Sequence, residues 1–143
     1  MAQEKGKRWI KKDADLALLA VRVMFVLFMI HGVQKLMALD GIVKFFGSLG
    51  IPAPGVMAPF IAVLEAFGGL ALALGIWTEY IGPLIALDMG MAILLTKAGA
   101  MLSKGLPLSL TSMEVEFGYL IAALAVTLAG AGKYSLEEWL RKK

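Results

Sequence analysis

The stretch LALLAVRVMFVLFMIHGVQKL, residues 16–36, decides the fold of this chain. It is long enough to cross a lipid bilayer, which takes about 20 mostly apolar residues. It nevertheless contains Arg22, His31, Gln34 and Lys35, although ionisable side chains are costly at bilayer depth. Such side chains usually face the interior of a helix bundle and find partners there. The stretch therefore predicts a membrane helix whose polar residues contact other helices.

The composition of the whole chain is that of a membrane protein. Of its 143 residues, 59% are hydrophobic and 17% are charged, whereas soluble domains are about 25% charged. The chain has no cysteine, which excludes disulfides, thiolate metal sites and iron–sulfur clusters held by its own residues. The net charge of +3 does not indicate nucleic-acid binding, because the basic residues gather at the two termini. We expect one integral membrane domain, residues 1–143.

Hydrophobic runs predict four membrane helices, at about residues 16–36, 56–77, 80–96 and 113–130. Between the first two, apolar residues recur at helical spacing and predict a short interfacial helix that Gly50 ends; they are Ile42, Phe45, Phe46 and Leu49. The predicted fold class is therefore all-α: an integral membrane four-helix bundle with a short interfacial helix in the first outer loop.

The distribution of Lys and Arg predicts the orientation of these helices. Five basic residues precede the first helix and four lie from Lys133 onward, whereas the outer loops hold only Lys44 and Lys104. The positive-inside rule then places both termini in the cytoplasm, an N-in, C-in topology. We expect a prokaryotic plasma membrane.

Helix ends are marked by capping residues. Either Asp13 or Asp15 is placed to cap the first helix. Two pairs have the spacing of a capping box, at the start of the fourth helix and of a short helix in the tail; these are Thr111 with Glu114, and Ser135 with Glu138.

The charges within the membrane form two layers when depth is counted at about 1.5 Å per residue. Arg22, in the inner third, has Asp88 and Glu65 as candidate partners. Towards the outer end, Lys35 and His31 have three candidate acids, Glu65, Glu114 and Glu116. All of these could be structural salt bridges that join the helices, and Glu114 is already explained as a cap. The residues best suited to bind a ligand are His31, Lys35 and Glu65, with Gln34 beside them. No residue is singled out as catalytic and no metal-ligand set occurs.

An ordered set of motifs resembles the DoxX/DoxD family of small four-helix membrane proteins. The matching residues are Arg22, the segment His31-Gly32-Val33-Gln34-Lys35-Leu36, Gly50-Ile51-Pro52-Ala53-Pro54, Glu65-Ala66-Phe67-Gly68-Gly69, an acid opening the fourth helix, and Gly130-Ala131-Gly132-Lys133-Tyr134-Ser135-Leu136-Glu137. The resemblance spans nearly the whole chain from Arg22 to Glu137. Two departures are Ala131, where the family often has Pro, and Glu137, where it often has Asp.

The resemblance implies a role in electron transfer. Such proteins are described as the membrane subunit of a thiosulfate:quinone oxidoreductase or as membrane partners of soluble redox enzymes. It implies a quinone-interacting subunit with His31, Gln34, Lys35 and Glu65 at the quinone, and with Arg22, Asp88, Glu114 and Glu116 in structural ion pairs. Haem is less favoured, because the single histidine would need Met, Lys or a second copy's His31 as the other axial ligand. Without cysteine, any sulfur chemistry would occur on a partner or a bound cofactor.

The alternative interpretation is non-enzymatic: a membrane scaffold or chaperone-like partner protein, held together by intramembrane salt bridges. A transporter ranks third, because no pair of broken helices is evident. Expected partners are the lipid bilayer and a soluble redox partner or second membrane subunit. The small residues Ala86 and Gly90, four positions apart, also allow a homodimer, although they could pack within one chain instead.

Overall fold

The structure is a computed structural model that describes the backbone of residues 2–97 and 111–143, and the side chains from Asp13 onward within those ranges. These residues are all-helical, and no strand occurs among them. The elements are α1 (Ala2–Met37), α2 (Leu39–Ser48), α3 (Pro54–Val63), η1 (Leu64–Gly68), α4 (Gly69–Leu74), α5 (Thr78–Ala92), η2 (Ile93–Lys97), α8 (Glu114–Ala129) and α9 (Leu136–Arg141). Most of the predicted loop that contains Lys104, and the side chains of the basic N-terminal residues, lie outside the described residues.

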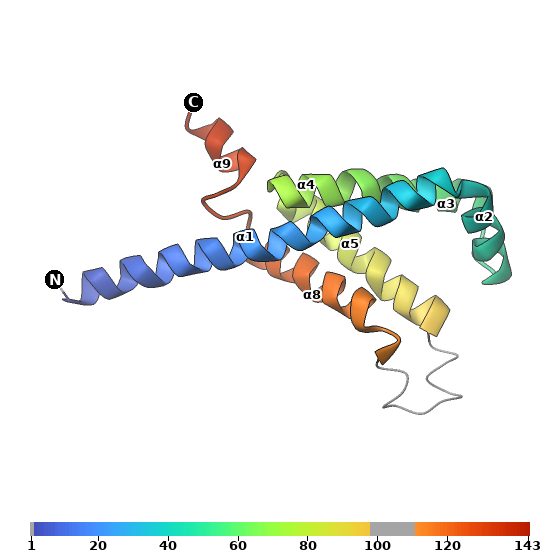
Figure 1. Cartoon of the computed structure of the whole chain (residues 1–143), viewed down its shortest axis with the longest axis horizontal. Coiled ribbons are helices and arrows are strands. Elements are labelled where there is room, and N and C mark those ends of the chain that lie inside the picture. Colours follow the sequence, from blue (N-terminus) through green and yellow to red (C-terminus); the bar gives the residue numbers. More distant parts are fainter. Residues whose placement is uncertain (1, 98–110) are drawn as a thin grey trace.

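Three stretches are long and apolar enough to cross a membrane: Asp13–Met37 in α1, Pro54–Leu74 through α3, η1 and α4, and Thr78–Lys97 through α5 and η2. They correspond to the first three predicted helices. The fourth predicted helix forms as α8, which has 16 residues. In Figure 1 the chain runs along α1 to α2, returns through α3 and α4, and runs back again through α5; its N- and C-terminal parts lie at the end away from α2.

The hydrophobic core lies where α1, α4, α5 and α8 meet. Its buried members are Phe25, Phe28, Leu72, Ile85, Met89, Tyr119, Ala122, Ala123 and Val126. The rings of Phe28 and Tyr119 are 4.8 Å apart between centroids, so aromatic packing joins α1 to α8. Ala86 packs against this same core, so part of the small-residue face predicted for a homodimer is occupied within the chain.

The first helix begins earlier than predicted, at Ala2 rather than near residue 16. The preceding residues contain no proline and are rich in Lys, Glu, Arg and Ala, which favour helix. Asp13 and Asp15 therefore lie inside α1, and the prediction that one of them caps its start is wrong. The Oδ1 atom of Asp15 instead accepts a hydrogen bond of 3.0 Å from the backbone nitrogen of Lys133.

The second helix ends at Leu74 rather than near residue 77, because Gly75 adopts a left-handed conformation with φ +71°. Its N–H donates to Leu72 O at 3.1 Å, and the N–H of Ile76 donates to Ala71 O at 2.9 Å. These two bonds are those of a Schellman motif, which satisfies the last carbonyls of a helix. The connection to α5 is therefore Gly75 to Trp77 rather than Thr78 and Glu79.

The predicted short helix in the first loop is confirmed as α2, and Gly50 ends it with φ +73°. The predicted capping box of the tail is also confirmed, because Ser135 Oγ accepts a hydrogen bond of 3.1 Å from the backbone nitrogen of Glu138. The other capping box does not form as predicted. Helix α8 begins at Glu114 with Met113, rather than Thr111, as its N-cap residue, and the Met113 side chain makes no capping hydrogen bond.

Candidate functional site

An ion pair between Lys35 and Glu65 forms the centre of the candidate site. Lys35 lies in the last turn of α1, and its ammonium donates to Oε1 of Glu65 in η1. The Glu65 side chain is 2% exposed and that of Lys35 is 31% exposed, so the pair connects the protein interior with the surface. This is one of the pairings that the sequence left open for Lys35.

Two backbone features bring Glu65 to α1. Residues 64–68 form a π-helical segment, a local widening of the helix that is frequent at functional sites. On the facing helix, a Cβ atom on Gly32 would lie 2.1 Å from the backbone nitrogen of Ala66 and 2.6 Å from the carbonyl carbon of Glu65. The missing side chain of Gly32 therefore allows α1 and η1 to make contact through their backbones.

Asp88 of α5 joins this pair. Its carboxyl group interacts electrostatically with the Glu65 carboxyl group and with Lys35. Two buried oxygens, Oε2 of Glu65 and Oδ2 of Asp88, have no hydrogen-bond donor among the described residues. We call Lys35, Glu65 and Asp88 the polar cluster. It joins α1, η1 and α5.

His31 and Gln34 lie on the exposed part of α1. They are accompanied there by exposed apolar residues, Leu27 and Ile30, which precede them by one helical turn. The structure therefore places two of the predicted ligand-binding residues on the surface of α1 and the other two, Lys35 and Glu65, in the polar cluster.

Arg22 does not pair with Asp88 or Glu65, the partners that the sequence proposed. Its buried guanidinium donates to four backbone carbonyls, those of Leu72 at 3.2 Å, Ala73 at 2.9 Å, Ala131 at 2.8 Å and Tyr134 at 3.1 Å. The first two belong to the last turn of α4 and the others to the segment after α8. A cation is favourable at the C-terminal ends of helices, where carbonyls lack intrahelical partners.

Of the two acids at the start of α8, Glu116 forms an ion pair with Lys97, with 3.7 Å between Nζ and Oε1. Glu114 is exposed in the first turn. This ion pair joins η2 to α8, so Glu116 contacts a neighbouring helix. Among the described residues, no group of three or more His, Asp or Glu side chains could hold a metal ion.

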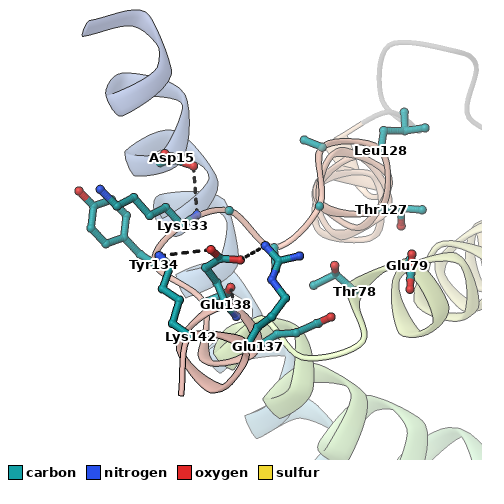
Figure 2. A pocket seen from close by; sticks show the side chains of 16 residues that line it. Asp15, Thr78, Glu79, Thr127, Leu128, Lys133, Tyr134, Glu137, Glu138 and Lys142 are labelled. Atoms are coloured by element: carbon teal, nitrogen blue, oxygen red, sulfur yellow. Dashed lines mark hydrogen bonds and ion pairs between the residues drawn. The ribbon is translucent and has the colours of Figure 1, made fainter. Parts of the chain in front are cut away.

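At the end of the molecule that holds α9, an open cleft of about 1150 Å³ lies between α9, the start of α5 and the end of α8. Figure 2 shows Asp15, Lys133, Glu137 and Glu138 around it. Lys142 Nζ lies 3.2 Å from Oε1 of Glu138, and Arg141 contacts the same carboxylate. The hydrogen bond from Lys142 lowers the pKa of Glu138 below its ordinary value, and Arg141 adds to the effect. The sequence did not indicate this cleft, although Gly130 and Gly132 mark the turn that forms one side of it.

The helical fold, its apolar stretches and its polar cluster define a membrane protein, with ionisable residues joining its helices. The chain belongs to the DoxX family, because the sequence model of that family matches its residues 17–98. It is 32% identical to "Putative oxidoreductase CatD" of Bacillus subtilis (strain 168) over 124 residues, which are 86% of this chain and 84% of that protein.

Two relatives are inner membrane proteins of Escherichia coli (strain K12). YqjF is 27% identical over 135 residues, 94% of this chain and 99% of YqjF. YphA is 35% identical over 79 residues, 54% of this chain and 56% of YphA. No solved structure matches the chain.

Proposed function

We propose that this chain is the membrane subunit of a redox system and binds a quinone beside the polar cluster. The observation that carries the proposal is the Lys35–Glu65 pair, a buried carboxylate joined to a cation that reaches the surface of α1. Charged groups in membrane helices are costly and usually mark functional sites. The name of the Bacillus relative, "Putative oxidoreductase CatD", supports a redox role.

The residues present suit a quinone. A quinone carbonyl accepts hydrogen bonds, and Lys35 has three N–H donors, of which Glu65 uses one. His31 and Gln34 offer further donors on the exposed face of α1, and Leu27 and Ile30 provide apolar surface for the ring and tail. Apolar surface with a few convergent polar groups is typical of cofactor sites. Haem is less suited, because the single histidine is exposed on one helix face.

Each residue has a defined task in this proposal. A bound quinone supplies the electron-accepting chemistry. Lys35 and His31 donate hydrogen bonds to its carbonyl oxygens, and Glu65 holds Lys35 in position. Because the chain has no cysteine, sulfur or iron–sulfur chemistry belongs to a partner. We assign the α9 cleft to a soluble oxidoreductase, because its charged side chains lie at the end where the positive-inside rule places the cytoplasm.

The topology that we propose has α8 as a fourth membrane crossing. Its 16 residues rise about 24 Å, somewhat less than the roughly 30 Å hydrocarbon core, and Met113 and the preceding turn extend it. The chain is then a single-domain four-helix bundle with N-in, C-in topology, and α2 lies in the outer interface. A homodimer would use helix faces other than the one on which Ala86 packs.

The experiment that tests quinone binding is extraction of the purified protein. The protein is purified in mild detergent and extracted with organic solvent, and quinone per chain is quantified by mass spectrometry. We expect near-stoichiometric quinone from the unchanged protein. We expect about a tenfold loss, equivalent to roughly 1.4 kcal/mol, in His31→Ala and in Glu65→Gln, with both variants still folded.

The matched control is Glu116→Gln, which neutralises the acid of another ion pair between helices. It should retain its quinone. Lipid alone from the unchanged protein, or full quinone in both His31→Ala and Glu65→Gln, would overturn the proposal.

A scaffold is the second candidate function, favoured by the contacts of Arg22. Its guanidinium fixes the segment that leads into α9 to the bundle, so α9 and its cleft are held in place for a partner. If the extract contains only lipid, this function is preferred. A cross-linker on α9 should then capture the same partner from native membranes in the presence and absence of quinone.

A further inference from the structure

Three ionisable groups meet in the polar cluster, and their charges do not balance. Lys35 carries one positive charge, whereas Glu65 and Asp88 would carry two negative charges if both were ionised. The Glu65 residue is 1% exposed, so water cannot screen the excess charge. Two carboxylates at close range in a low-dielectric site cannot both ionise without a large cost.

The hydrogen bonds of the two acids also indicate that one proton is missing from the cluster. Each acid has one buried oxygen without a donor among the described residues, and buried oxygens without donors are rare in folded proteins. Two ionised carboxylates are acceptors only, so neither can satisfy the other. One proton between them converts one acid into a donor and provides the missing bond.

Among the residues that the structure describes, no further charge is placed to balance the second carboxylate. From α1 the cluster is faced by Lys35, with His31 exposed one turn earlier. From α5 it is faced by Asp88, and from α8 by Tyr119, a neutral phenol within electrostatic range of Glu65. Arg22 is engaged elsewhere by four carbonyls.

We propose that Glu65 and Asp88 share one proton, so that the polar cluster is electrically neutral and serves as a proton-exchange site inside the membrane. In an exchange, the O–H bond of the acid pair breaks and water or another acceptor takes the proton. A proton from water then restores the O–H bond, and no electron moves. The 31% exposed Lys35 side chain marks the path to the surface, near the end of α1. The proposal goes beyond the quinone, because the shared proton is present whether or not a quinone binds.

Infrared spectroscopy of the protein in lipid at neutral pH detects this proton directly. A protonated carboxyl has a C=O stretching band that is separate from carboxylate bands and shifts in D₂O. We expect one such band in the unchanged protein, and its loss in Asp88→Asn, whose amide can donate to Glu65 in place of the shared proton. Glu116→Gln, in the ion pair with Lys97, is the matched control and should leave the band unchanged.

Lys35→Met gives a second, independent readout. Without the cation, the buried Glu65 and the half-buried Asp88 are most stable when both are protonated, so the integrated band should rise about twofold. This measurement stands even if Asp88→Asn fails to fold. The proposal is overturned if the unchanged protein has no such band, if the band persists in Asp88→Asn, or if Lys35→Met leaves its intensity unchanged. Loss of quinone with the band intact would refute only the proposed quinone site.

Discussion

A Cβ atom on Gly32 would lie 2.1 Å from the backbone nitrogen of Ala66, so α1 and η1 touch backbone to backbone beside the polar cluster. Real Cβ atoms do not approach backbone atoms so closely, and the backbone cannot move aside as a flexible side chain can. This contact fixes the distance between Lys35 and Glu65. A second close contact joins α1 to α4, because a Cβ atom on Gly69 of α4 would lie 2.7 Å from the backbone nitrogen of Met29.

Gly32→Ala should therefore separate the two helices. Inserting extra carbon into a well-packed contact typically costs about 1–3 kcal/mol, and a backbone contact should lie at or above the top of that range. Thermal unfolding in detergent measures the loss. Gly118→Ala is the control, because nothing lies within 4 Å of a Cβ atom there and alanine favours the helix. An equal change in the two variants would contradict the close contact.

Arg22→Met should destabilise the protein by roughly 2–5 kcal/mol, because four carbonyls lose a charged donor. The stability of Arg22→Lys should lie between those of the unchanged protein and Arg22→Met, since an ammonium has three N–H groups for four acceptors. Hydrogen exchange should increase in residues 131–141 in both variants. Arg141→Met removes an exposed cation of the same region and should leave stability nearly unchanged. Unchanged exchange in Arg22→Met would show that this residue does not hold α9.

Gly75→Ala and Gly50→Ala form a matched pair. Both glycines have positive φ, +71° and +73°, so alanine is strained at either position, at a cost of about 1–2 kcal/mol. Only at Gly75 would the new Cβ also meet a neighbour, at 2.6 Å from Cζ of Arg22. We expect Gly75→Ala to lose clearly more stability in thermal unfolding, and to loosen α9 as Arg22→Met does. Equal losses would mean that the Arg22 guanidinium moves aside freely.

Acidification should loosen α9 through Glu138. The hydrogen bond from Lys142 lowers the pKa of this carboxyl in the folded protein. A group whose folded pKa is lowered stabilises the fold above its unfolded pKa, and this contribution is lost as the pH falls through the folded value. Hydrogen exchange of α9, corrected for the intrinsic effect of pH, should therefore rise below the ordinary glutamate range. In Glu138→Gln, hydrogen exchange of α9 should depend less on pH. The same pH dependence as in the unchanged protein would show that Glu138 is not the group responsible.

The sequence by itself determined the helices and several of their ends. Apolar runs located the three stretches that can cross a membrane, because covering the hydrocarbon core requires a fixed length of apolar helix. The spacing of Ile42, Phe45 and Phe46 located α2, and Ser135 with Glu138 located the start of α9. These features depend on neighbours along the chain, so local sequence specifies them. The first helix was predicted too short because its polar extension carries no apolar pattern.

Only the tertiary structure decided the partners of the buried charges. From the sequence, opposite charges at similar depth were expected to pair. Lys35 with Glu65 was one of these pairs, but Arg22 was predicted to bind an acid, whereas it binds backbone carbonyls. Every residue carries a carbonyl, so residue identity does not reveal which carbonyls a helix end leaves free. Asp88 instead interacts with Glu65, which lies in the π-helical turn at residues 64–68. Such contacts depend on how helices rotate and how closely their backbones meet, which packing of the whole chain decides.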